Sequence, residues 1–88
     1  WGSRQLLPEG WMAQSLEPSA TNDGYGFLWW LNRGGRNYPS APADSWFALG
    51  AGTNLIWVAP SQDLVAVVRW IDKAKADGFF KRLMAAAA

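Results

Sequence analysis

"NLIWVAPSQDLVAVVR", residues 54–69, is the stretch of sequence that decides the fold. The runs at 54–59 and 64–70 are rich in β-branched and aromatic residues, which favour strands. Between them, Pro60 fixes its own φ and Asp63 can hydrogen-bond its local backbone, so a tight turn is expected. Strands joined by so short a turn must be antiparallel, because a parallel crossover needs a dozen or more residues.

Both faces of this predicted hairpin are apolar. Side chains alternate along a strand, so Leu64, Ala66 and Val68 point one way while Val65 and Val67 point the other way. An antiparallel sheet with one face in water should carry polar residues at alternate positions. The sheet therefore needs cover on both faces, and we expect either a large exposed apolar patch or a partner that covers it.

The segments before the hairpin add a short helix and two more strands. Residues 1–18 are expected to hold a helix with Pro8 in its first turn, closed by Pro18. The apolar face of this helix consists of Trp11, Met12 and Leu16. The aromatic run at 25–31 is predicted to form the first strand, and residues 45–49 the second, because both are rich in strand-forming residues.

Residues 72–88 are predicted to form a C-terminal helix. Its apolar positions recur at helical spacing and are Ala76, Phe79, Phe80, Leu83, Met84 and Ala87. Asp72 is suited to the N-cap, whereas Gly78 inside the helix costs about 1 kcal/mol relative to alanine. The predicted fold is α+β, with three or four antiparallel strands between residues 25 and 70 and this helix packed on one face of the sheet.

Composition excludes several classes of function. The formal charge is +1 with scattered signs, so no nucleic-acid footprint is expected. The chain has no cysteine and no histidine, and we predict neither a disulfide nor a metal or cofactor site. No apolar run approaches the ~20 residues of a membrane-spanning helix. The chain begins at Trp1 without methionine or a signal-peptide pattern, which suggests an upstream segment.

Tryptophan is abundant for so small a protein. A chain of 88 residues can form one small core, yet this chain has seven tryptophans. Tryptophan is amphipathic and tolerates partial exposure, which is one explanation. The other is that several of these rings pack against protein that is absent from the chain.

Four short motifs occur in an order that resembles the C-terminal third of the β-lactamase-like serine hydrolases. These motifs are LLPEGW at 6–11, YGFLWW at 25–30, FALGAG at 47–52 and IWVAPSQDLVAVV at 56–68. The family includes class C β-lactamases, DD-peptidases, esterases and aminohexanoate-oligomer hydrolases. The resemblance implies that residues 1–88 are a single C-terminal fragment of such a domain, and that its partner is the remainder of that catalytic domain.

The nucleophile of that family is absent from this sequence. Family members use the serine of a Ser-x-x-Lys turn, assisted by a tyrosine or serine of a second motif, and both precede the segment seen here. Ser15, Ser40 and Ser61 are followed three positions later by proline, alanine and leucine. A serine without a base is a poor nucleophile, so the chain alone is predicted to be inactive.

The family's third motif aligns with Ala48-Leu49-Gly50, where members often have lysine or histidine, then threonine or serine, then glycine. Only Gly50 matches. The resemblance implies that the backbone N–H of Ala51 is one donor of the oxyanion hole, and that Ala48, Leu49, Gly50 and Gly52 contact the substrate. Because Ala48 supplies no cation for a substrate carboxylate, an esterase or amidase is favoured over a true β-lactamase.

Other interpretations of the same residues stay open. Gly50 and Gly52 are also typical of an ordinary bulge or turn. Tyr25, Trp30 and Trp46 could line a substrate cleft or pack within the sheet. The alternative function is a non-catalytic, tryptophan-rich module that binds a sugar or peptide, or that covers its open sheet with a second copy of itself.

Overall fold

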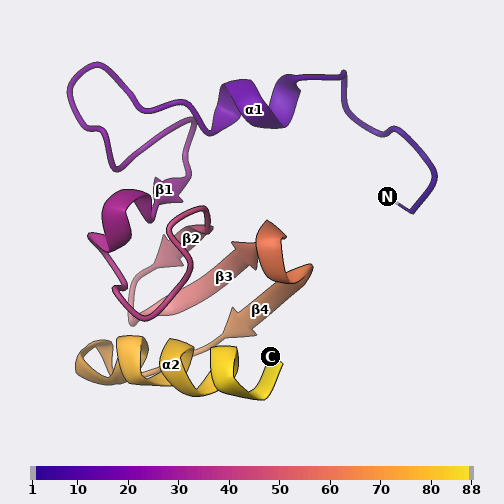
Figure 1. Ribbon diagram of the computed structural model, residues 1–88. Coiled ribbons are helices and arrows are strands. Elements are labelled where there is room, and N and C mark those ends of the chain that lie inside the picture. The colour runs from indigo at the N-terminus through magenta and orange to yellow at the C-terminus, as the bar shows by residue number, and fades with distance from the viewer. Residues whose placement is uncertain (1, 88) are drawn as a thin grey trace.

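The computed structural model describes residues 2–87, and Figure 1 shows a sheet with one long helix against it. The elements are α1 (Trp11–Ser15), β1 (Trp30–Leu31), η1 (Arg33–Gly35), β2 (Trp46–Gly50), β3 (Asn54–Ala59), η2 (Pro60–Gln62), β4 (Leu64–Val68), η3 (Lys73–Lys75) and α2 (Ala76–Ala87). The strands form one antiparallel sheet in the order β1-β2-β3-β4. The α+β prediction is confirmed.

The central hairpin agrees with the sequence analysis. β3 and β4 pair from Leu55 opposite Val68 to Ala59 opposite Leu64. The turn between them is a single 3-10 turn, and Asp63 closes it at a φ of 51°. Aspartate tolerates this left-handed conformation better than most residues, which explains its position at the end of the turn.

The predicted first strand at 25–31 is largely wrong. Only Trp30–Leu31 is a strand, and Tyr25 forms an isolated bridge with Trp30 because the segment folds back on itself. Leu28, at a φ of 66°, lies in the reversal. The amide of Phe27 donates to the carbonyl of Ser15 (2.9 Å), so this segment is held against the end of α1 instead of extending the sheet.

The N-terminal helix is shorter than predicted. Gly10, at a φ of 83°, precedes the first helical residue, so Pro8 lies outside the helix and not in its first turn. The predicted apolar face is only partly covered: Trp11 is 43% exposed and Met12 is 37% exposed, although the Trp11 ring lies 6.2 Å from that of Phe27. Figure 1 places α1 at the opposite end of the molecule from α2.

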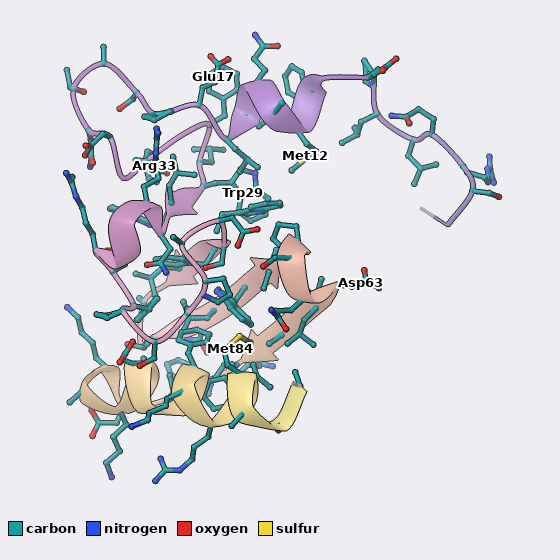
Figure 2. All side chains as sticks on the ribbon, viewed as in Figure 1. Met12, Glu17, Trp29, Arg33, Asp63 and Met84 are labelled. Atoms are coloured by element: carbon teal, nitrogen blue, oxygen red, sulfur yellow. The ribbon has the colours of Figure 1, made fainter. Side chains whose placement is uncertain are left out.

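The core lies between the sheet and α2. Its buried side chains are Ala41, Phe47, Leu55, Trp57, Ala59 and Phe80. The rings of Trp57 and Phe80 are 4.7 Å apart, and Tyr38 packs on Phe80 at 4.8 Å. Met84 also packs against this cluster, and Figure 2 shows it between α2 and the sheet. The prediction that the C-terminal helix covers one face is confirmed.

Hydrogen bonds fix the start of the C-terminal helical segment. The Asp72 carboxylate accepts from the backbone N–H of Ala74 (3.0 Å), which confirms the predicted N-cap at the 3-10 turn that leads into α2. Gly78 does not interrupt the helix. The Asp77 carboxylate accepts from both the N–H (2.9 Å) and the hydroxyl (2.7 Å) of Ser40, which ties α2 to the connection before β2.

A buried asparagine organises that connection. The side chain of Asn32 is fully buried, and its amide nitrogen donates to the carbonyl oxygens of Tyr38, Ala41 and Pro42 at 3.0, 3.2 and 3.0 Å. Its amide oxygen accepts from the N–H of Tyr38 (2.9 Å). Buried polar groups need such partners. The Asn32 side chain therefore supplies hydrogen bonds to residues 38–42, which do not form a strand.

Candidate functional site

The face of the sheet away from α2 is apolar. Within residues 2–87 it is exposed toward β4, whereas Trp46, Ala48 and Val58 are half-buried. Alternation along the strands places Trp46, Ala48, Ile56, Val58, Val65 and Val67 on this open face. Ile56, Val65 and Val67 are 48%, 62% and 66% exposed, whereas Leu55 and Trp57 on the other face are 1% and 0% exposed. These three side chains form an exposed apolar patch, which was one of the two expected outcomes.

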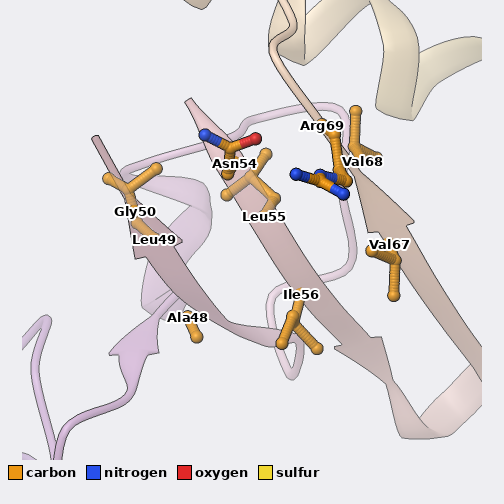
Figure 3. A pocket seen from close by; sticks show the side chains of 9 residues that line it. All are labelled: Ala48, Leu49, Gly50, Asn54, Leu55, Ile56, Val67, Val68 and Arg69. Carbon is orange, nitrogen blue, oxygen red and sulfur yellow. The ribbon is translucent and has the colours of Figure 1, made fainter. Parts of the chain in front are cut away.

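A shallow hollow of about 450 Å³ lies at one end of the open face. Figure 3 shows the residues that line it, on three neighbouring strands and just beyond β4: Ala48, Leu49, Gly50, Asn54, Leu55, Ile56, Val67, Val68 and Arg69. The polar side chains among them are those of Asn54 and Arg69. The hollow is thus an apolar surface with one amide and one cation near the end of the sheet.

The predicted site residues lie together where β2 ends. Ala48 is half-buried on the open face, and Leu49 is 44% exposed on the α2 face. Gly50 is the last residue of β2, and Ala51 and Gly52 are exposed in the following turn. Ala48, Leu49 and Gly50 line the hollow, whereas Ala51 and Gly52 lie beyond its lining.

Half of β2 is an open edge. β1 pairs with Trp46 and Phe47 only, so the outer side of residues 48–50 has no strand partner in the described chain. An unpaired strand edge presents backbone N–H and C=O groups that an added chain or ligand can bond. Three of the predicted site residues, Ala48, Leu49 and Gly50, therefore lie on the exposed edge of the sheet, and the other two follow it in the turn.

Gly50 and Gly52 differ in whether their surroundings require glycine. Gly52 has a φ of 85°, and a Cβ there would overlap the indole of Trp70, so the turn and this contact both require glycine. A Cβ at Gly50 would lie 3.7 Å from the nearest atom outside its chain neighbours, Cβ of Asn54, which is an ordinary contact. Its backbone is not left-handed, so no contact within residues 2–87 demands glycine at position 50.

Sequence reasoning missed the role of two residues at this turn. Trp70 was expected to end the fourth strand, but β4 ends at Val68, and Trp70 has a φ of 56° and is 70% exposed. Asn54 accepts from the N–H of Trp70 (3.0 Å) and donates to the carbonyl of Ala51 (2.7 Å). A tryptophan and an asparagine beside a turn give no sequence signal for such a contact.

A second hollow, of about 290 Å³, lies on the other side of β2. Its lining is more polar and consists of Trp30, Asn37, Tyr38, Phe47, Leu49, Lys73, Ala74 and Asp77. Burial raises the pKa of the Tyr38 hydroxyl, so this phenol stays neutral at a higher pH than an exposed tyrosine does. Tyr25 packs edge-on against Trp30 at 4.7 Å, which supports a packing role for Tyr25.

The serine hydroxyls named above have ordinary structural partners. Ser15 donates to the carbonyl of Trp11 (2.8 Å), and Ser61 donates to the carboxylate of Asp44 (3.1 Å). Residues 2–87 contain no cluster of histidine, cysteine or carboxylate side chains that could hold a metal ion. Within the same range, no helix has the length and apolar character needed to cross a bilayer.

Comparison with known proteins gives no match to a family model, a curated protein or a solved structure. Function must therefore be argued from two features, the open face and the exposed edge at residues 48–52.

Proposed function

We propose that this chain is the C-terminal part of a β-lactamase-like serine hydrolase. In that enzyme it supplies the edge strand of the active site and one backbone N–H of the oxyanion hole. The nucleophile and its base come from the remainder of the catalytic domain, which also covers the open face. The chemistry is acyl transfer through an acyl-enzyme, and this chain alone has no turnover.

The observation that carries the proposal is the exposed apolar face. Ile56, Val65 and Val67 are each about half or more exposed, and burying such a side chain fully contributes about 1.5–3 kcal/mol. Layered domains bury an apolar sheet face against another layer, and among residues 2–87 only α2 forms such a layer. A second layer from the rest of a catalytic domain accounts for this face and for the surplus of tryptophan.

The open edge of β2 supports the catalytic part of the proposal. Gly50 is not required by its own surroundings, so its lack of a side chain is available for close approach of an acyl group to the strand. The N–H of Ala51 follows directly, on an exposed residue. A backbone donor aimed at a developing oxyanion contributes about 3–4 kcal/mol, and it needs no particular side chain at this position.

The proposed substrate class follows from the lack of a cationic side chain at position 48. Ala48 aligns with the position where members of the proposed family often have lysine or histidine, and alanine cannot pair with a substrate carboxylate. We therefore favour an ester or amide substrate without a carboxylate beside the reacting bond. A β-lactam or a C-terminal peptide is the less suitable substrate.

Covalent labelling tests the proposal. The native polypeptide that contains this sequence is captured with an antibody raised against the chain, then treated with a fluorophosphonate. We expect the label on a serine followed three positions later by lysine, located outside the 88 residues by peptide mass spectrometry. The isolated chain is the matched control and should stay unlabelled. An unlabelled native polypeptide, or a label within these residues, contradicts the proposal.

A second candidate function is self-association through the open face. The same exposed valines favour it, because a strand-rich apolar surface can be covered by a second copy of the chain. The labelling experiment separates the two candidates, since a self-associating module has no reactive serine.

A further inference from the structure

Trp70 adopts an unfavourable backbone conformation although its side chain is largely exposed. Its φ of 56° lies in the left-handed region, where the Cβ of a bulky residue is crowded against the backbone. Burial does not offset this cost, because Trp70 is 70% exposed. A strained residue that persists without burial calls for a functional explanation.

Two hydrogen bonds connect Trp70 to the turn after β2. The backbone N–H of Trp70 donates to the side-chain oxygen of Asn54 (3.0 Å), and the side-chain nitrogen of Asn54 donates to the carbonyl of Ala51 (2.7 Å). The side-chain oxygen and the side-chain nitrogen of Asn54 therefore both form hydrogen bonds. Asn54 thereby joins the end of β4 to the tip of the β2–β3 turn.

The indole of Trp70 makes the third contact with this turn. It lies against Gly52 so closely that a Cβ at that position would overlap the ring. Gly52 has a φ of 85° and Thr53 has a φ of 57°, and two successive left-handed residues are not a conformation that threonine favours. External contacts are therefore needed to hold the turn in one state.

We propose that Asn54 and Trp70 are positioning residues for the backbone N–H of Ala51. The peptide unit that carries the Ala51 N–H begins at Gly50, which pairs with Asn54 between β2 and β3. The Asn54 side chain fixes the next peptide unit through the Ala51 carbonyl, and the Trp70 ring restricts Gly52. Rotation about the Ala51 backbone is therefore limited on both sides, and its N–H is held in one orientation. The catalytic part of this inference rests on the proposed function, in which the Ala51 N–H is a donor of the oxyanion hole. The restraint itself is a property of the described chain, and it can be measured without a substrate.

The first test measures backbone motion by ¹⁵N relaxation in the native polypeptide that contains these 88 residues. In the unchanged chain we expect an order parameter of about 0.85 for the Ala51 N–H, falling below about 0.6 in Asn54→Ala and in Trp70→Ala. Trp70→Phe should retain most of the order, because a ring still lies on Gly52. Trp11→Ala removes another exposed tryptophan and is the control for loss of an indole alone.

The pattern of amide shifts in β3 and β4 reports whether each variant keeps its fold. Should Trp70→Ala unfold, Asn54→Asp supplies the second variant, since it keeps the acceptor for Trp70 but loses the donor to Ala51. An Ala51 order parameter that is the same in the unchanged chain and in a folded Asn54 variant overturns the inference.

The second test uses the native hydrolase and an activated ester. We expect Trp70→Ala and Asn54→Ala to lower kcat about tenfold or more with KM nearly unchanged, because they affect stabilisation of the transition state and not substrate binding. Trp70→Phe should restore most of kcat. A rigid Ala51 amide with unchanged kcat in the variants overturns the positioning role. Absence of a fluorophosphonate-reactive serine instead defeats the proposed function, and leaves the measured restraint of the turn intact.

Discussion

Asn32 illustrates how one residue can stabilise a segment that lacks regular structure. Its buried side chain donates to three carbonyl oxygens between residues 38 and 42 and accepts from one N–H. Its position after a short strand gives no sign of this in the sequence. Only the path of the following connection brings these backbone groups around one amide.

Replacing Asn32 with alanine should lower the free energy of unfolding by about 3 kcal/mol, because it removes the partner of the Ala41 carbonyl and of the Tyr38 N–H inside the protein. Urea denaturation measures this loss. Asn37→Ala is the matched control, since Asn37 is exposed and makes one bond, from its side chain to the carbonyl of Leu31. Equal losses in the two variants would show that the Asn32 network contributes little.

Tyr38 makes stability depend on alkaline pH. Burial raises its pKa above the ordinary value of 10.0, so the unfolded chain loses this proton at lower pH than the folded chain. Stability from this group is fully present below pH 10.0 and is lost as pH rises through the folded-state pKa. Denaturation of Tyr38→Phe should show a weaker fall of stability above that pH. An identical alkaline fall in both proteins would contradict the assignment.

The role proposed for Ala51 depends on its N–H alone. In the native hydrolase, Ala51→Pro removes the donor and should lower kcat by about 10²–10³-fold. Ala51→Ser keeps the N–H and should retain nearly full activity, so it controls for the change of side chain. Steady-state kinetics with an activated ester measure both variants. Equal activity of the two variants would exclude this amide from the oxyanion hole.

At the scale of elements, the aromatic run at 25–31 shows where strand propensity is overridden. The run was predicted to be one strand, but it forms a reversal whose Tyr25 bridges Trp30. A Cβ at Gly26 would overlap the carbonyl oxygen of Ser15, so the close approach of α1 requires glycine there. Propensity describes a residue's fit to a pleated surface, and it cannot indicate that such a contact bends the chain.

The docking of α2 depends mainly on Phe80, which is fully buried against Tyr38 and Trp57. Phe80→Ala should lower the free energy of unfolding by about 3–5 kcal/mol, because it removes apolar contacts and leaves a cavity. Phe27→Ala is the control, since Phe27 is 55% exposed. Thermal and urea denaturation compare the two variants. A loss of less than 1 kcal/mol for Phe80→Ala, on the order of a surface change, would contradict this packing.

At the scale of the whole molecule, the open face should govern behaviour in solution. The isolated chain is expected to self-associate through this face, because the described residues leave Ile56, Val65 and Val67 exposed on it. Val65→Lys combined with Val67→Glu places charges on the face and should shift the chain toward monomer in sedimentation equilibrium. Lys81→Glu changes an exposed charge on α2 and should leave association unchanged. A wild-type chain that stays monomeric at high concentration would contradict the prediction.

The sequence by itself determined the β3–β4 hairpin, the covering helix and the apolar character of both faces of that hairpin. These follow from alternation, helical spacing and a short turn, which are local properties of consecutive residues. It also indicated the site residues at 48–52, but only by resemblance. Only the tertiary structure decided that residues 25–31 reverse direction and that the Trp70 ring lies on Gly52. It also decided that the buried Asn32 side chain bonds the backbone between residues 38 and 42. Each of these depends on contacts between residues that are not neighbours in the sequence. The pattern of consecutive residues carries no information about such contacts.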